Sequence, residues 1–195
     1  MATGAAMHRE LTPLRYAVDP RLSRFSVRVS ADGPLAKLGH NPTITIADYS
    51  GDIDCVPSQI EASHFVVRIQ ARSLVVTDDM NEKDRAEIHA RMYKDVLETD
   101  KIPEIAYEST SIVSQLVFEH HYRVQVTGKL SLHGVVRTQQ ITAQVAFVGD
   151  RLRASGDFTL LQSHYNMKLY TVGLGALKVK DELKFIFDMV ANKTA

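Results

Sequence analysis

The chain has one cysteine, no tryptophan and no excess of charge of either sign. Cys55 is the single cysteine among 195 residues, which excludes an intramolecular disulfide framework and fits a reducing compartment. Lysine and arginine together number 23, as do aspartate and glutamate, so the formal net charge is zero. A neutral chain without basic runs has no overall field that would attract nucleic acid or anionic lipid. We therefore expect no nucleic-acid partner.

Long apolar runs are also missing. The longest uncharged stretch with apolar character, residues 138–149, is far shorter than the roughly 20 residues that a membrane-spanning helix needs, and it alternates like a strand. No apolar core of signal-peptide length occurs near the N-terminus, because Arg9 and Glu10 interrupt the only stretch where one could begin. We expect no membrane span and a cytoplasmic location.

Alternation of apolar and polar residues is what the sequence has in abundance. The pattern recurs in VTGKLSLHGVVRTQQITAQV, ASGDFTL and VKDELKFIFDMVA, and Gly and Pro break it. Alternate residues of a strand point to opposite faces, so a long alternating chain is most stable when its sheet closes around one apolar interior. A single domain of this length is large enough to bury such a core.

The alternating segments predict about eight strands, which is the number in a small up-and-down barrel. Residues 16–30 are predicted to form a miniature pair of strands with a bend at Pro20. Further strands are expected at 44–55 with a kink near Gly51, and at 65–69, 105–113, 122–132, 137–148, 152–160 and 183–190. Tight turns are predicted at His133-Gly134 and Gly149-Asp150, whereas residues 161–182 form a long connection.

The segment 78–99 has helical periodicity. Two apolar stripes follow it: Met80, Ile88, Met92 and Val96, and beside them Ala86, Ala90, Tyr93 and Leu97. Asp78 or Asp79 is the expected N-cap. Glu87 and Arg91, four residues apart, are expected to pair on a side that faces solvent. We expect one amphipathic helix packed at an end of the barrel, where it plugs the open end or forms a lid over a mouth, and we favour the plug.

Eight histidines raise a metal- or haem-dependent enzyme as an alternative function. His40, His133 and His164 fall in predicted loops or turns, but none has a second ligand at the usual metal spacing. The most site-like loop is LGHN, since His40 and Asn41 offer donors and an acceptor near neutral pH, although turn formation explains the same residues. We expect no metal, no cofactor and no catalysis. Replacing the three histidines by Ala should leave the fold intact.

Nucleophilic and dinucleotide chemistry have even less support. No G-x-S-x-G motif occurs, and Cys55 follows an aspartate in a predicted strand, where a buried and inert thiol is expected. The GLGAL stretch at 173–177 lacks a third spaced glycine, and it is interpreted as a flexible loop.

Several short motifs resemble the YceI-like family of lipocalin-type barrels, and they occur in the family's order. They are YAVDPRLSRFSV, KIPEIAYEST, VTGKLSLHGVVR, ASGDFTL and VKDELKFIFDMV. Three positions depart from the family pattern, since Leu22 stands where a His is usual, Gln162 where an Arg is frequent and Asn166 where a Gly is common. The resemblance implies an all-β, eight-stranded antiparallel lipocalin-like barrel over residues 16–191, with a helix at one end. Residues 1–15 are then a polar leader.

The resemblance also implies a function, which is the non-catalytic binding or carriage of an isoprenoid or acyl lipid in an apolar barrel cavity. The predicted ligand-binding residues are the apolar face and one loop: Phe25, Val27, Phe65, Val67, Val124, Val126, Leu130, Leu132, Ile141, Val145, Phe147, Phe158, Phe185, Phe187, His40 and Asn41. Arg28, Arg137 and Lys178 are further candidates for polar groups at the mouth. The same apolar residues also fit a solid core, which would make the chain a protein-interaction module. The oligomeric state, a homodimer included, stays open.

Overall fold

The computed structural model describes residues 12–32, 42–172 and 177–194 of the chain. Within these ranges, twelve strands belong to one antiparallel sheet. Their bounds are β1 (Leu14–Val18), β2 (Arg24–Asp32), β3 (Thr43–Ile46), β4 (Tyr49–Cys55), β5 (His64–Gln70), β6 (Leu74–Val76), β7 (Glu104–Phe118), β8 (His121–Leu132), β9 (Val135–Val148), β10 (Arg151–Leu161), β11 (Thr171–Val172) and β12 (Leu177–Lys193). The helical segments are η2 (Ile60–Ala62), η3 (Ala71–Ser73), α1 (Glu82–Arg91), η4 (Met92–Val96) and η5 (Gln162–Tyr165).

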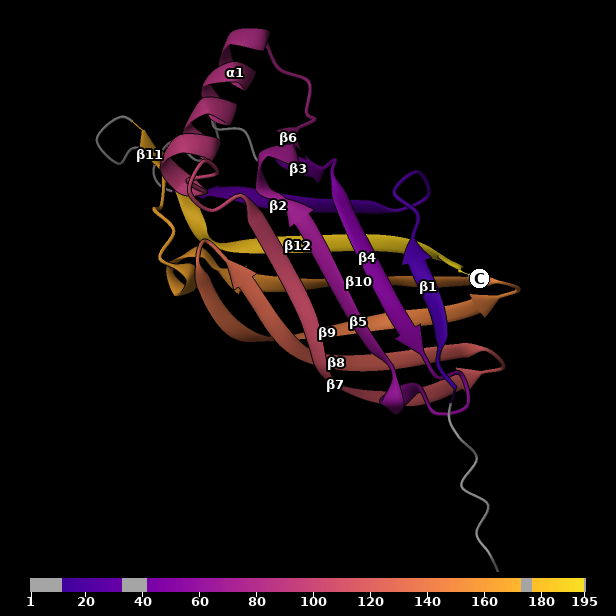
Figure 1. Cartoon of the computed structure of the whole chain (residues 1–195). Helices are drawn as coiled ribbons and strands as arrows, with labels where there is room; N and C mark the ends of the chain where they lie inside the picture. The colour runs from indigo at the N-terminus through magenta and orange to yellow at the C-terminus, as the bar shows by residue number, and fades with distance from the viewer. Residues whose placement is uncertain (1–11, 33–41, 173–176, 195) are drawn as a thin grey trace, which may run out of the picture.

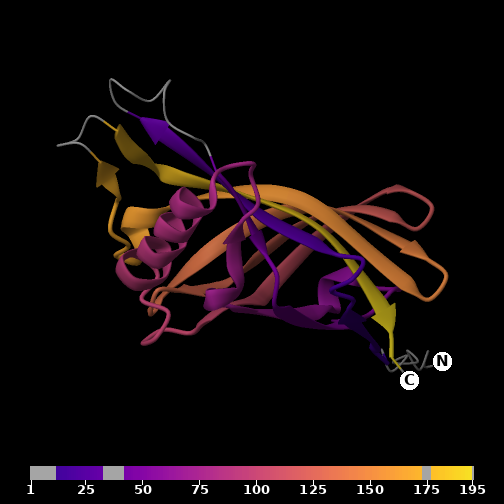
Figure 2. The ribbon, with the colours of Figure 1, turned by 90° about the horizontal axis from the view of Figure 1, so that it is seen from above.

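The sheet closes into a barrel of eight strands (Figures 1 and 2). Its order is β1-β4-β5-β7-β8-β9-β10-β12, and β12 pairs back with β1, where Tyr16 lies opposite Lys193. β2 and the short strands β3 and β6 extend this wall beside β12. The prediction of an eight-stranded antiparallel barrel is therefore confirmed.

The predicted miniature strand pair differs in one respect from the structure. β1 and β2 do not pair with each other, because both lie along the same edge of β12. The bend between them is held there by Ser23, whose hydroxyl donates to the carbonyl of Val190 at 3.1 Å and accepts from the amide of Val190 at 2.9 Å. Pro20 thus lies in a bend between β1 and β2, two strands that follow one another along the same edge of β12.

The predicted facing of the strands is confirmed. Val27 and Val126 are buried and Phe25 is half-buried, whereas Arg24 and Arg28 are exposed. A shift of one residue would have exchanged the two faces, so strict alternation along β2 was enough to assign them. The turns at His133-Gly134 and Gly149-Asp150 are also present.

The predicted kinked strand 44–55 is two strands, because β3 pairs with β2 and β6 whereas β4 pairs with β1 and β5. Strand boundaries also depart from the prediction at other places. β7 continues to Phe118, five residues beyond the predicted end at 113, and β12 begins at Leu177, within the predicted connection 161–182. β1 begins at Leu14, inside the segment assigned to the leader, because Leu14 pairs with Cys55 and Arg15 with Asp54. Partner strands that are distant in the sequence set these limits.

The predicted helix is shorter than 78–99 and has another N-cap. Asn81 caps α1, since its side chain accepts a hydrogen bond from the amide of Asp84 at 2.9 Å. Asp78 instead accepts from the amide of Thr43 at 2.5 Å, which ties the approach to the helix onto β3. Met92–Val96 then form a π-helical turn, η4.

The first predicted helix stripe packs against the barrel, since its members are buried or half-buried, whereas the second packs only at its C-terminal end. In the second stripe Leu97 is buried and Tyr93 is half-buried, but Ala86 and Ala90 are exposed. Small alanine side chains bury too little apolar area to hold a second face of the helix against the sheet. The ion pair between Glu87 and Arg91 is confirmed, with Arg91 Nη2 2.6 Å from Glu87 Oε1.

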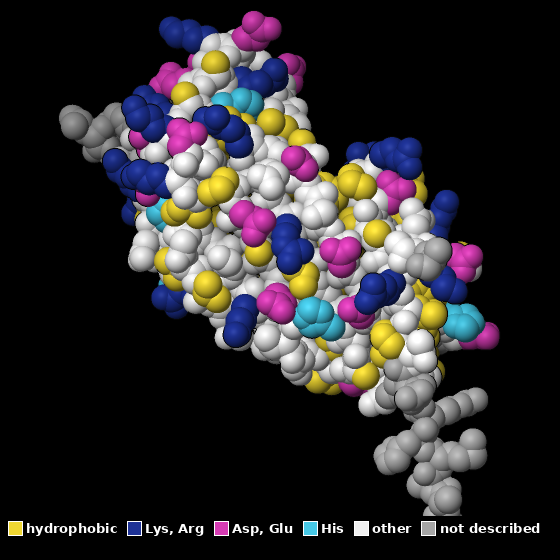
Figure 3. Space-filling view, viewed as in Figure 1, with side chains coloured by type: hydrophobic (Ala, Val, Ile, Leu, Met, Phe, Trp, Pro, Cys, Tyr) yellow, Lys and Arg dark blue, Asp and Glu magenta, His cyan; other side chains and the backbone are white. Residues whose placement is uncertain are grey.

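Charges of both signs are interspersed on the face that Figure 3 shows, without a region of a single sign. No helix in the described ranges is long and apolar enough to cross a membrane. Both views of the ribbon place α1 at one end of the barrel and the β7–β8 and β9–β10 hairpins at the opposite end.

Candidate functional site

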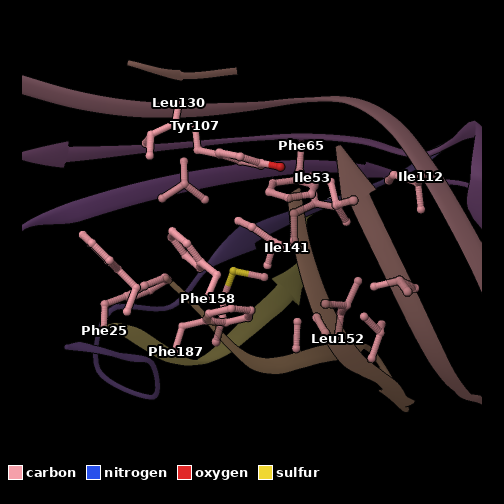
Figure 4. A pocket seen from close by; sticks show the side chains of 18 of the residues that line it. Phe25, Ile53, Phe65, Tyr107, Ile112, Leu130, Ile141, Leu152, Phe158 and Phe187 are labelled. Atoms are coloured by element: carbon pink, nitrogen blue, oxygen red, sulfur yellow. The ribbon is translucent and has the colours of Figure 1, made fainter. Parts of the chain in front are cut away.

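The barrel encloses an apolar cavity of about 160 Å³. Its lining side chains come from opposite walls and point toward a common space, as Phe25, Phe158 and Tyr107 do in Figure 4. Phe158 and Phe185 stack with their ring centroids 5.0 Å apart. We call this space the barrel cavity.

Small inward-facing residues leave room for the barrel cavity. Ala143 and Ala154 line it from neighbouring strands, and each stands where a larger side chain would fill the space. Two glycines let aromatic rings lie flat against the wall. A Cβ atom at Gly128 would come within 2.5 Å of Tyr107 Cζ, and one at Gly156 within 3.0 Å of Phe187 Cζ. Side-chain volume decides whether an eight-stranded barrel is solid or hollow, and here it leaves a hollow.

Thirteen of the predicted apolar ligand-binding residues line the barrel cavity: Phe25, Phe65, Val67, Val124, Val126, Leu130, Leu132, Ile141, Val145, Phe147, Phe158, Phe185 and Phe187. The fourteenth, Val27, lines a second hollow described below. Their positions agree with the alternation, while their role in binding a ligand stays a prediction.

Sequence reasoning missed slightly more than half of the cavity wall. The missed residues are Ile46, Ile53, Cys55, Ile60, Ser63, Ile69, Ile105, Tyr107, Ile112, Ala143, Leu152, Ala154, Ile186 and Met189. Alternation on β4 and β7 could have identified Ile53, Ile105 and Tyr107. Ile60 and Ser63 lie in and after a short helical turn, where no strand period exists.

A larger hollow of about 520 Å³ lies between α1 and the near end of the barrel. Its apolar walls include Val29 and Ile44 from the sheet and Ile88 from the helix. We call this space the helix-side chamber. It shares Ile105, Leu132 and Phe185 with the barrel cavity, so these side chains form the partition where the two hollows meet. η4 closes part of the barrel end through Met92, whereas α1 forms one wall of an open chamber.

The rim of the helix-side chamber carries two acids and two bases. Asp84, Glu87, Arg91 and Lys178 border it. The Arg91 guanidinium lies 4.9 Å from the ring centroid of Tyr170, a cation–π distance, and its hydrogen bond to Glu87 raises its pKa. This arrangement places fixed polar groups beside an apolar interior, as ligand sites commonly do.

The structure places the predicted mouth residues in different positions. Lys178 borders the chamber, as expected for a group at a mouth. Arg28 is exposed on the outer face of β2. Arg137 lies opposite Leu130 on the inward period of β9, but it is exposed near the end of that strand, and its Nε donates to the carbonyl of His164 at 2.6 Å. Neither residue lines the helix-side chamber. His40 and Asn41 lie outside the described residues, as do residues 173–176 of the GLGAL stretch.

The interior offers little reactive chemistry. Burial raises the pKa of the Cys55 thiol, so the buried side chain stays protonated, as predicted for an inert thiol. Burial also raises the pKa of Tyr107, whose hydroxyl donates to the carbonyl of Gln139 at 3.1 Å. Within the described ranges, no group of three or more His, Cys, Asp or Glu side chains could hold a metal ion.

His133 has a structural role that sequence reasoning missed. Its Nδ1 donates to the carbonyl of Tyr165 at 3.0 Å, and its Nε2 lies 3.2 Å from Glu98 Oε2. A hydrogen bond from Lys101, with a further one from His133, lowers the pKa of Glu98. The side chain thereby links the β8–β9 turn, η5 and the segment before β7.

We therefore expect His133→Ala to lower the free energy of unfolding by about 1–3 kcal/mol, because it leaves the buried Tyr165 carbonyl without its partner. The expectation that the fold survives replacement of all three histidines stays a prediction, and these contacts place its main cost at His133. His164→Ala is the matched control, since His164 is exposed and only its backbone carbonyl is bonded to Arg137. Urea unfolding measures both variants, and equal midpoints would contradict the role of His133.

Two of the three departures from the family motifs have visible roles. Asn166 has φ of +55°, a left-handed conformation that Asn tolerates almost as well as Gly. Gln162 is buried at the chamber, and its Nε2 donates to the carbonyl of Lys180 at 2.8 Å. Leu22 is exposed in the bend before β2.

The closed eight-stranded barrel, the apolar cavity and the helix at one end define a lipocalin-like barrel. The model of the YceI-like domain matches residues 16–191, and the chain belongs to this family. The resemblance found in the sequence motifs is thereby confirmed.

Solved structures support the fold. BcnA of Burkholderia cenocepacia matches with a TM-score of 0.69 and 20% identity, over 90% of this chain and 99% of that chain. A polyisoprenoid binding domain from Saccharophagus degradans, implicated in plant cell wall breakdown, matches with a TM-score of 0.69 and 15% identity, over 93% and 99% of the two chains. The YCEI protein of Campylobacter jejuni matches with a TM-score of 0.58 and 18% identity, over 77% and 84%. Among curated proteins, no sequence matches this chain.

Proposed function

We propose that the protein binds one isoprenoid or acyl lipid without chemically altering it. The observation that carries the proposal is the contact between two apolar hollows at the partition of Ile105, Leu132 and Phe185. A dry cavity of about 150 Å³ holds a benzene-sized molecule, so the barrel cavity alone takes only a short apolar segment. The helix-side chamber lies in the usual size range of ligand sites, and the two hollows together suit a longer chain.

In this proposal the chain end enters the barrel cavity and the rest of the lipid fills the helix-side chamber. The polar head then stays at the rim, near Arg91, Tyr170 and Lys178. Each CH₂ group that leaves water contributes about 0.8 kcal/mol, which drives the chain inward against the costs of association and ordering. The description of the Saccharophagus degradans relative as a polyisoprenoid binding domain supports this ligand class.

A chain-length series tests the proposal. Isoprenoid alcohols of increasing length are titrated into the purified protein, and binding is measured by calorimetry. We expect saturable binding of one ligand per chain, with an affinity that rises with each isoprene unit until the hollows are full and then levels off. Native mass spectrometry after gentle purification would also report the mass of any lipid that the protein carries. The absence of saturable binding at every length would favour the interaction-module alternative.

A further inference from the structure

Exposed apolar side chains gather at the end of the barrel opposite α1. Leu116, Val117 and Phe118 end β7, and each is more than half exposed. Val148, which is 67% exposed, ends β9 at the adjacent β9–β10 hairpin. The two hairpins touch, because the amide of Phe147 donates to the carbonyl of His120 at 3.0 Å. We call Leu116–Phe118 together with Val148 the apolar tip.

The apolar tip projects because β7 extends beyond the end of its neighbouring strand, β5. β5 pairs with β7 only as far as Glu108, opposite Val66. Beyond that point the same edge of β7 meets η2, where the Glu61 carboxylate accepts from the amide of Ser114 at 3.2 Å. After Ser114 the strand has β8 on one side and no paired strand on the other within the described ranges.

The part of β7 that ends in the tip also lacks the residues that usually protect an unpaired edge strand from association. Natural edge strands carry charged residues or proline, which discourage association. From Ser109 to Phe118 the sequence STSIVSQLVF contains neither. Its exposure is therefore compatible with a partner that accepts apolar side chains.

The geometry of the tip selects the kind of partner. Leu116 lies opposite Tyr122 on the inward period of the strands, and Val117 follows it on the outward period. Apolar side chains consequently cover both faces of the hairpin as well as its end. A flat protein surface contacts one face, whereas the interfacial layer of a bilayer surrounds an inserted hairpin on all sides.

Charges behind the apolar tip suit the phosphate layer of a membrane. Arg123 on β8 and Arg151 on β10 are exposed and form no ion pair with any residue that the structure describes. Two exposed acids lie in the turns of the same hairpins, where Glu119 is 3.5 Å from His120 and Asp150 is 3.9 Å from Lys193. Arg151 lies opposite Val148, so an unpaired cation stands beside the apolar tip, as it does in many interfacial anchors.

We propose that the apolar tip inserts into the surface of a lipid bilayer and docks the barrel there. Because the tip and α1 lie at opposite ends, docking leaves the rim of the helix-side chamber open to solution. The inference goes beyond the proposed function, and it holds whether or not the barrel carries a lipid.

Tryptophan fluorescence tests the proposal directly, because the natural chain has no tryptophan. Phe118→Trp places a single reporter in the tip, and Val136→Trp places one at an equally exposed apolar position on β9. Each variant is mixed with vesicles of phosphatidylcholine and with vesicles that also contain phosphatidylglycerol. We expect a blue shift of the emission for Phe118→Trp only, and a larger bound fraction on the anionic vesicles.

A loss-of-binding variant completes the test. Leu116→Asp combined with Val117→Asp should lower the fraction that floats with vesicles by about tenfold, whereas Val136→Asp should leave it unchanged. Circular dichroism checks that all variants fold. Failure of the wild type to float with either kind of vesicle would overturn the proposal. So would a concentration-dependent dimer that the double variant abolishes, because the tip would then bind a second copy of the chain. The vesicle assay contains no isoprenoid alcohol, so its failure is separate from failure of the chain-length series.

Discussion

Val126→Trp is expected to weaken isoprenoid binding at least about tenfold while the barrel remains folded. Val126 is 4% exposed, lies on β8 between Ile112 and Ile141 of the neighbouring strands, and lines the barrel cavity. An indole ring there would occupy much of a cavity of about 160 Å³. Displacing two CH₂ groups of the ligand already accounts for a tenfold loss.

Binding and folding need separate measurements in this experiment. Overpacking a core costs about 1–3 kcal/mol, although an existing void absorbs part of that cost. Val136→Trp is the control, since it adds the same ring at a side chain that is 60% exposed on β9. Calorimetric titration gives the affinity and urea unfolding gives the stability. Unchanged affinity of a folded Val126→Trp protein would show that the lipid chain lies outside the barrel cavity.

Gly128→Ala should lower the free energy of unfolding by about 3 kcal/mol, although it adds only one carbon atom. The new Cβ would lie 2.5 Å from the carbonyl oxygen of Glu108 and 2.5 Å from Tyr107 Cζ. The backbone oxygen cannot move without disturbing the β7–β8 pairing. Displacing the tyrosine ring would also break its hydrogen bond to the carbonyl of Gln139.

Gly149→Ala is the control for loss of a glycine without a clash. No atom lies within 4 Å of its ideal Cβ, but its φ of +57° makes a cost of about 1 kcal/mol expected. Tyr107→Ala combined with Gly128→Ala should cost less than the sum of the single changes, because the two residues touch. Equal unfolding midpoints for Gly128→Ala and the wild type would contradict this account of the cavity wall.

Much of the barrel interior was predictable from alternation. Val124, Val126 and Leu130 on β8, and Phe185 and Phe187 on β12, follow a period of two and all line the barrel cavity. Such a period has only two registers, and burial of the apolar set selects one of them.

The helix-side chamber was not predictable in the same way. Its walls combine Ile44, Ile88, Leu183 and Tyr170, which belong to segments far apart in the sequence. Each of these residues looks like ordinary core or loop in its own segment. The helix itself was predicted, but its packed face was overestimated, since periodicity counts Ala86 and Ala90 as apolar without weighing the small area that they bury.

The contacts of His133 and the exposure of the apolar tip were likewise not predictable from the sequence. A lone histidine beside Gly134 predicts a turn, but its bonds to Tyr165 and Glu98 arise only when η5 folds back onto that turn. Likewise, the residues from Ser114 to Phe118 become an exposed end only because β5 is shorter than β7.

The sequence by itself determined the all-β class, the eight-stranded antiparallel barrel, the family and the side of each strand that faces inward. These properties depend on local periodicity and motif order, which survive without knowledge of distant contacts. Only the tertiary structure decided that the barrel is hollow, that a second chamber adjoins it at Phe185, and that the apolar tip is exposed. These properties depend on how side-chain volumes and strand lengths from separate parts of the chain match. They therefore arise only when those elements pack together.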